Sequence, residues 1–205
     1  MANVNAPFGL RPIRYASGAP YNGAVNEYFA TGATGAIFIG DPVVAAGSAN
    51  TAAVQGREAG TLPTVTVAVA GDGNDILGVC VGVVPVTRDS TIYRENSTDR
   101  IILVADDPNL VFIGQTDAAS TAWAATDSGA FANLLTGTGS TGSGLSGMTL
   151  DTTDGPDVAD VSNQLRIIRV HGRIGNEIGA YAIWEVMINN HDLANVNDGG
   201  RFTGV

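Results

Sequence analysis

The feature that most constrains the fold of this chain is a series of short apolar segments separated by turn-forming residues. Within residues 62–70, Val65, Val67 and Val69 alternate with smaller or polar side chains. A period of two residues is typical of a strand with one buried face. Similar apolar segments occupy residues 36–45, 76–86, 100–105, 109–116, 164–171 and 180–189. About seven to ten short strands at this spacing predict an all-β (mainly β) fold, either a compact β-barrel or a β-sandwich.

One segment favours a helix. Residues 117–125 begin with Asp117, whose side chain is suited to cap a helix, and they are rich in alanine. We expect at most one or two short helices in the chain. The stretch TGTGSTGSGLSG at residues 136–147 follows, and it predicts a flexible loop or the tip of a hairpin.

Charge and composition narrow the classes of partner. The 205 residues include 10 basic and 20 acidic side chains, so the formal net charge is −10, and every basic residue is an arginine. Nucleic acids and anionic membranes attract clustered positive charge, so the acidic balance argues against both as partners.

A chain of this length buries about 70% of its unfolded surface. We therefore expect it to fold without a metal ion or a disulfide.

We expect three parts: an extended N-terminal arm over residues 1–35, a β-rich body over 36–188 and a C-terminal tail over 189–205. Prolines and glycines recur through the first thirty residues, so we expect no regular strand pairing there. The same segment is rich in aromatic and apolar side chains, unlike a disordered tail. Residues 1–7 lack the pattern of a signal peptide, and no apolar stretch approaches the roughly 20 residues of a membrane span.

The arm carries two arginines, Arg11 and Arg14, among its aromatic residues. Arginine pairs with carboxylates, stacks on aromatic rings and is enriched at protein interfaces. The arm could dock on the acidic surface of another copy, and pairing within its own chain is the equal alternative. The residues that we expect to make interface contacts are Phe8, Leu10, Arg11, Ile13, Arg14, Tyr15 and Tyr21.

No motif singles out catalytic chemistry. Residues 71–78 match one calcium-binding nonapeptide, but such repeats hold calcium between consecutive turns and no second copy exists, so we interpret them as a hairpin turn. Residues 106–109 (DDPN) indicate an acidic turn between strands. Neither His171 nor His191 belongs to a recognisable hydrolase motif. We therefore predict no enzymatic activity, no catalytic residue, no cofactor and no metal site.

Three further side chains have simple interpretations. Cys80, the single cysteine, lies in an apolar segment and is expected to be a buried, unreactive thiol. Trp184 lies in the middle of an expected strand and is interpreted as a core residue. Trp123 is open to either interpretation, as a core residue or as an exposed platform.

The N-terminal segment also carries a resemblance to a known family. Residues 5–14 (NAPFGLRPIR) and 18–23 (GAPYNG) resemble the opening of small virion proteins encoded beside the major capsid protein in tailed bacteriophages. Further similar segments are residues 38–44, 76–79, 104–108 and 144–148. Over most of its length, the chain is similar to the capsid decoration, or cement, proteins of these phages.

This resemblance implies a β-rich trimer on the outer capsid face at three-fold and quasi-three-fold positions, with arms or loops that clamp adjacent major capsid protein subunits. It implies no cofactor and no active site. The expected partners are the major capsid protein and the chain itself, without nucleic acid or membrane, and the expected location is the outer capsid surface after synthesis in the host cytoplasm. A tail or fibre component that binds host glycans is the alternative, and it needs an exposed aromatic platform near Trp123 or Trp184. A lytic virion enzyme is a third class.

Overall fold

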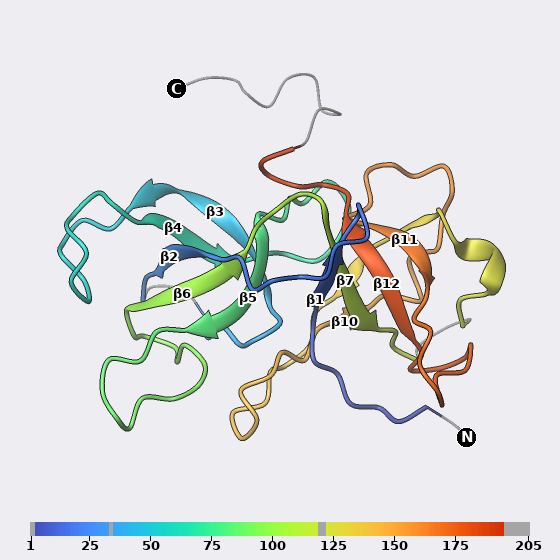
Figure 1. Cartoon of the computed structure of the whole chain (residues 1–205), viewed down its shortest axis with the longest axis horizontal. Helices are drawn as coiled ribbons and strands as arrows, with labels where there is room; N and C mark the ends of the chain where they lie inside the picture. The colour runs from blue at the N-terminus through green and yellow to red at the C-terminus, as the bar shows by residue number, and fades with distance from the viewer. Residues whose placement is uncertain (1–2, 33–34, 119–121, 195–205) are drawn as a thin grey trace.

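Strands dominate the chain, and they form two bodies that lie next to each other along its long axis (Figure 1). The computed structural model describes residues 3–32, 35–118 and 122–194. The strands are β1 (Arg11–Tyr15), β2 (Asn26–Ala30), β3 (Pro42–Ala49), β4 (Pro63–Val67), β5 (Gly78–Val83), β6 (Arg100–Ala105), β7 (Leu110–Gln115), β8 (Phe131–Ala132), β9 (Leu134–Leu135), β10 (Thr149–Leu150), β11 (Leu165–Val170) and β12 (Ile183–Ile188). The predicted all-β fold is confirmed.

Helix is confined, within those described ranges, to one 3-10 turn, η1 (Ala125–Asp127). It begins where the expected helix over residues 117–125 ends. Residues 119–121 of that expected helix lie outside the described part of the chain. No helix in the described part is long and apolar enough to cross a membrane.

The first body is a closed barrel of five strands in the order β2-β4-β3-β5-β6. Its interior is filled by small and branched apolar side chains from Ala30, Ile37, Val43, Val65, Leu77, Cys80, Ile102 and Val104. The alternation predicted for residues 62–70 holds for Val65 and Val67, which both pack in this interior. Val69 lies beyond the end of β4 and is exposed.

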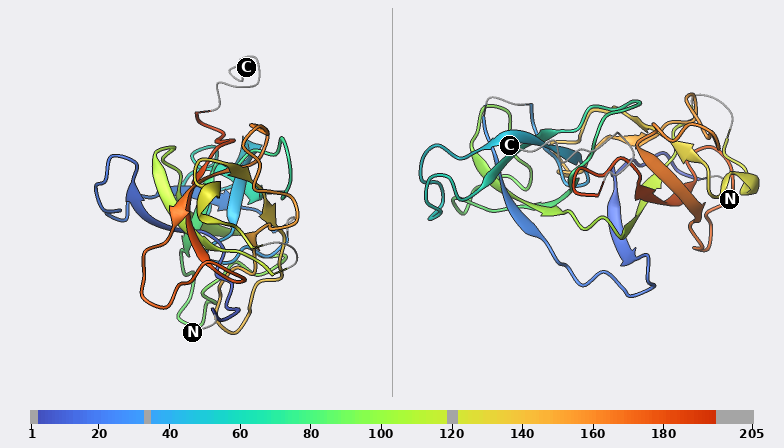
Figure 2. Two further views of the ribbon diagram at one scale, coloured as in Figure 1. Left: turned by 90° about the vertical axis from the view of Figure 1, so that its right-hand side faces the viewer. Right: turned by 90° about the horizontal axis from the view of Figure 1, so that it is seen from above.

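The second body is a five-stranded antiparallel sheet in the order β1-β7-β12-β11-β8. The inner face of this sheet buries Phe112 and Trp184, and the Trp123 ring packs against the Trp184 ring with centroids 5.5 Å apart. The same core includes Val79 and Ala105 from the barrel strands β5 and β6. One hydrophobic core therefore runs from the sheet to the barrel, and the right-hand view of Figure 2 shows the two bodies side by side.

Of the two expected turns between strands, residues 106–109 do join consecutive strands, and residues 71–75 do not form a hairpin. The hairpin interpretation of residues 71–75 is wrong, because this segment joins β4 to β5, and β3 lies between those strands in the barrel. Residues 106–109 carry the chain from β6 of the barrel to β7 of the sheet. Asp106 is buried at this crossing, where it accepts hydrogen bonds from Asn26 Nδ2 (2.9 Å) and the Tyr28 hydroxyl (2.6 Å). This acidic side chain therefore has a structural role.

The expectation that residues 1–30 lack regular strand pairing is wrong in two places. β1 pairs with β7 at the edge of the sheet, and β2 pairs with β6 in the barrel. Proline is tolerated in β1 because an edge strand leaves one side of its backbone unpaired, and the register of β1 is irregular between Pro12 and Arg14. The glycines at positions 9, 18 and 23 all lie outside these strands.

The segment 136–147 is the tip of a hairpin, because β9 and β10 pair on either side of it. Its Leu145 forms a bridge with Ile39, so the tip rests on the barrel. Of the expected C-terminal tail, residues 189–194 are described, and Asn190 and His191 are buried there. The remainder, residues 195–205, lies outside the described part.

The backbones of Gly9 and Gly40 touch where the arm crosses from the sheet to the barrel. Leu10 N donates to Gly40 O at 2.9 Å, and a Cβ on Gly9 would lie 2.1 Å from that oxygen. Gly9 also has a φ of +68°, a conformation that other residues rarely adopt. Two independent constraints therefore require glycine at position 9.

We predict that Gly9→Ala lowers the free energy of unfolding by about 2–4 kcal/mol, because it adds a backbone clash to the cost of a positive φ. The matched control is Gly18→Ala, since Gly18 has a φ of +94° and open space around its Cα. That control should lose about 1 kcal/mol. Urea unfolding followed by tryptophan fluorescence measures both, and equal losses would show that the close approach contributes nothing.

Candidate interaction surface

The residues expected at an interface lie along the chain's own sheet. Leu10 is 1% exposed and belongs to the hydrophobic core, whereas Arg11 is exposed. The other expected contacts, Phe8, Ile13, Arg14, Tyr15 and Tyr21, are half-buried. Of the two dockings that the sequence left open, the structure contains the one on the chain's own body, and Arg11 keeps the most exposed side chain of the set.

Strand register places arginines at both edges of the outer face of the sheet. One cross-strand row runs from Arg11 through Ile113 and Glu185 to Arg169. The next row runs from Arg14 through Val111 and Met187 to Arg166. Each row thus has an arginine on β1, another on β11, and mainly apolar residues between them. Arg173 follows shortly after β11. We call these five arginines, with Glu185 among them, the arginine face.

Glu185 is the centre of this face. Its side chain is only 4% exposed, yet two arginines and a histidine surround it. Arg14 Nη2 donates to it at 2.8 Å and Arg169 Nε at 3.0 Å, and His171 Nδ1 lies 3.2 Å away. Arg14 belongs to β1, so its side chain crosses β7 to reach β12. The carboxylate therefore ties three strands together on the outer side of the sheet.

Burial by itself would raise the pKa of Glu185. The hydrogen bonds from Arg14, Arg169 and His171 outweigh that cost and hold the pKa below its ordinary value of 4.5. A lowered pKa means that the folded state favours the charged carboxylate more than the unfolded state does. Glu185 accordingly stabilises the fold above about pH 4.5, and this contribution is lost as the pH falls through the lowered pKa.

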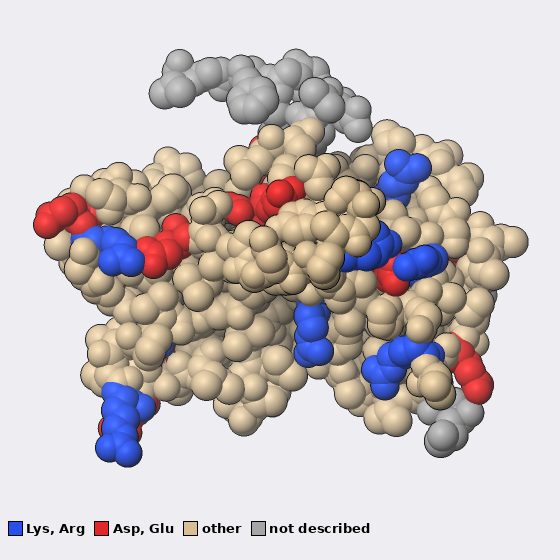
Figure 3. Space-filling model, viewed as in Figure 1, with Lys and Arg blue, Asp and Glu red and all other residues tan. Residues whose placement is uncertain are grey.

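The arginine face has more positive charge than its own carboxylate neutralises. Arg11, Arg166 and Arg173 form no ion pair with any carboxylate in the described ranges. With five arginines and one glutamate the face carries +4, and because the whole chain carries −10, the rest of it carries −14. Figure 3 shows basic groups gathered over the half of this view where β1, β7, β12 and β11 lie. Such a separation of charge favours contact with acidic protein surface.

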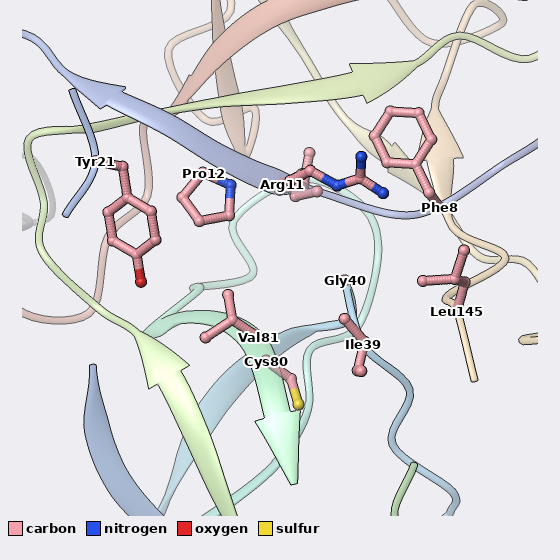
Figure 4. A pocket seen from close by; sticks show the side chains of 10 residues that line it. Phe8, Arg11, Pro12, Tyr21, Ile39, Gly40, Cys80, Val81 and Leu145 are labelled. Atoms are coloured by element: carbon pink, nitrogen blue, oxygen red, sulfur yellow. The ribbon is translucent and has the colours of Figure 1, made fainter. Parts of the chain in front are cut away.

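A cavity of about 220 Å³ lies between the arm and the barrel (Figure 4). Its lining is mainly apolar and comes from β1, the neighbouring barrel segments and the tip of the β9–β10 hairpin. Arg11 and Phe8 point toward one another at its rim, with the guanidinium carbon 4.9 Å from the ring centroid. The ring thus holds the Arg11 side chain in place without neutralising its charge.

A larger groove of about 550 Å³ lies at the end of the arginine face. Its walls are the arm, including Phe8 and Arg11, and the loop between β11 and β12, including Arg173 and Ile174. Gln115 holds both walls, because its Nε2 donates to Val4 O (2.8 Å) and to Tyr181 O (3.1 Å). We call this hollow the arginine groove.

Sequence reasoning found Arg11 and Arg14 but missed Arg166, Arg169, Arg173 and Glu185. A local signal existed for two of them, since Arg166 and Arg169 interrupt an apolar strand at exposed positions. A glutamate within the apolar strand Ile183–Ile188 was a second signal, because a carboxylate at a buried position needs a cationic partner.

The other residues that the sequence singled out, namely the cysteine, the two histidines and the two tryptophans, have structural roles. Cys80 is buried in the barrel, and burial raises the pKa of its thiol to about 12. His171 faces Glu185, whereas His191 is buried and its Nδ1 accepts a hydrogen bond from Leu193 N (3.1 Å). Trp123 and Trp184 are both 1% exposed or less, so neither offers the aromatic platform that a glycan-binding component needs. The described residues contain no group of three or more His, Cys, Asp or Glu side chains that could hold a metal ion.

Comparison with known proteins gives no assignment. No protein-family model matches the chain, no curated protein matches it, and no solved structure matches its fold.

We predict that Glu185→Gln lowers the free energy of unfolding at pH 7 by about 2–4 kcal/mol, because it leaves Arg14 and Arg169 without their buried counter-charge. The difference in unfolding free energy between wild type and variant should narrow as the pH falls below about 4.5, where Glu185 of the unfolded chain becomes protonated, and should vanish as the pH falls through the lowered pKa of the folded state. Urea unfolding at a series of pH values measures both effects.

The matched control is Glu27→Gln. Glu27 also pairs with an arginine, Arg57 at 2.7 Å, but both side chains are more than one-third exposed. Exposed pairs contribute little, so this variant should unfold like the wild type. A pH-independent loss in Glu185→Gln would contradict the assigned role of the charge.

We also predict that Cys80 reacts with thiol reagents about a thousandfold more slowly than a free cysteine at pH 8, because burial both blocks access and suppresses the thiolate. Labelling with a chromogenic disulfide reagent measures the rate. The same protein in guanidinium chloride should react at the ordinary rate, and fast labelling of folded protein would show that the barrel interior opens.

Proposed function

We propose that this chain is a structural virion protein that decorates and stabilises the outer face of a tailed-phage capsid by clamping adjacent major capsid protein subunits. It would act as a homotrimer at three-fold and quasi-three-fold positions. The observation that carries the proposal is the arginine face, where Arg11, Arg166 and Arg173 present positive charge that no carboxylate of the described residues neutralises. Interfaces between proteins are enriched in arginine and depleted of other charges at their cores.

The composition of the N-terminal arm supports the same function. The resemblance to decoration proteins is carried by residues 5–14, and within this segment Phe8 and Arg11 form one wall of the arginine groove. A decoration protein binds many equivalent positions, so contacts that are weak one by one add up within a trimer. Binding of this kind depends on surface shape and charge and uses no catalytic residue, and in the proposed function the chain acts without a cofactor.

The glycan-binding alternative has lost the feature on which it depended. It needed an exposed aromatic platform near Trp123 or Trp184, and both rings lie in the hydrophobic core. We therefore retain the decoration function as the proposal.

The test is co-sedimentation of the purified chain with DNA-filled phage heads that lack their decoration protein. We expect wild-type protein to pellet with heads and not with tails. Arg166→Glu should weaken this binding by about tenfold or more, because it reverses a charge on the arginine face without touching an ion pair. Deleting residues 1–30 is a poorer test, since it removes β1 and β2 from the fold.

The matched control is Arg88→Glu, which makes the same change in net charge on an exposed barrel loop between β5 and β6. It should bind heads like the wild type. Wild-type protein that stays in solution with heads, or pellets with tails instead, would contradict the proposed function. If the Arg166→Glu and Arg88→Glu variants bind heads equally well, the arginine face has no part in the proposed binding.

A further inference from the structure

The loop before β11 has the chemistry that the arginine groove lacks. Its sequence from Asp157 to Val161 is DVADV, with carboxylates at positions 157 and 160. Val158 and Val161 are 76% and 55% exposed, so apolar side chains stand beside the acids. The segment is held in one shape, because Phe131 pairs with Asp157 through two backbone hydrogen bonds (2.7 and 2.9 Å). We call residues 157–161 the acidic loop.

The arginine groove has the complementary set of groups. Arg11 stands on one wall and Arg173 on the other, and neither forms an ion pair with a carboxylate in the part of the chain that the structure describes. Beside Arg173, the side chain of Ile174 is fully exposed. A partner that covers large exposed apolar side chains and pairs with the charges beside them lowers the free energy of such a surface.

Hydrogen bonds within the single chain hold the walls of the arginine groove in place. Asn176 Nδ2 donates to His171 O and Ile183 O, both at 2.8 Å, and this closes the base of the β11–β12 loop. Asn3 Nδ2 donates to Glu177 O (2.8 Å) and Ala180 O (3.0 Å), which ties the arm to the same loop. A wall fixed in this way loses little conformational entropy when a partner binds.

The topology separates the two surfaces. The acidic loop leads into the start of β11 at Leu165, whereas the β11–β12 loop, with Arg173 and Ile174, follows its end at Val170. They therefore lie at opposite ends of one strand, and a molecule is not able to fill its own groove with its own acidic loop without unfolding that strand. Two copies aligned head to tail bring the pair together.

We propose that the arginine groove of one copy binds the acidic loop of a second copy of this chain. The charges select this occupant, because the rest of the chain carries −14 and the acidic loop joins carboxylates to exposed apolar side chains. The inference rests on the self-association in the proposed function and names the contact that produces it. The contact is heterologous, since each copy contributes a different surface to its two neighbours.

The test is the oligomeric state of the purified full-length chain in low salt, measured by sedimentation velocity without capsids. Wild-type protein should self-associate, and added salt should weaken this association because the contact pairs exposed charges. Arg173→Asp and Asp157→Arg should each raise the apparent dissociation constant by about tenfold or more. Both positions are exposed, so both variants should keep the wild-type circular dichroism spectrum, and Asp157→Arg loses only the hydrogen bond that its carboxylate accepts from Ala159 N (2.7 Å).

A double variant that carries Arg173→Asp and Asp157→Arg together should associate again, since every contact then pairs two reversed charges. Arg88→Asp and Asp89→Arg are the matched controls, because they make the same charge changes on an exposed barrel loop and should associate like the wild type.

Wild-type protein that is monomeric in low salt, single variants that associate normally, or a double variant that stays dissociated would each overturn the proposed contact. A monomer that still pellets with phage heads would overturn the contact and the homotrimer in solution, and would leave binding to the capsid standing. A chain that self-associates as expected but does not pellet with heads would overturn the proposed function and leave the contact standing.

Discussion

The close approach of Gly9 and Gly40 decides how the barrel and the sheet meet. At this point two backbones pass with no room for a side chain, so the arm is drawn against the barrel while β1 continues along the sheet. Leu10, the next residue, then enters the core that both bodies share. The position of β1 in turn sets which side chains reach the outer face, because a shift of one residue would exchange the two faces of the strand. The arginine face depends on this register.

Glu185 gives the arginine face its second constraint. A buried carboxylate is stabilised only if its partners are well placed, and here the partners come from strands on both sides of β12. The arrangement draws Arg14 across the sheet and fixes its orientation. It also leaves an excess of positive charge in one region of an acidic molecule. Since charges in solution are screened beyond about 8–10 Å, a partner at this face senses the arginines more than the distant acids. The overall charge of −10 therefore describes the chain poorly at the place where contact matters.

Local sequence pattern predicted the strands well and their arrangement poorly. The alternation around Val65 and Val67 was a reliable sign of a strand with one face inside a barrel. Proline and glycine in the arm concealed β1 and β2, because both strands are paired through partners about 70 to 100 residues away, such as Ile113 for Arg11. The rows that form the arginine face combine four strands from distant parts of the chain, so no local motif encodes them. Glu185 could have been singled out by its charge alone, but its partners could not.

The two surfaces used in the proposals occupy different parts of the sheet. The head-to-tail contact uses Arg11 of β1 and the loops at the two ends of β11, whereas Arg14, Arg166 and Arg169 of the arginine face do not line the groove. A heterologous contact forms a closed ring when the rotation between neighbours closes, and an open filament when it does not. In a closed ring, every groove and every acidic loop is occupied, and Arg11 and Arg173 with them, yet Arg14, Arg166 and Arg169 do not line the groove and stay outside the contact. Self-association is therefore compatible with contact to another protein. It also strengthens that contact, because each ring offers several identical faces to one partner surface.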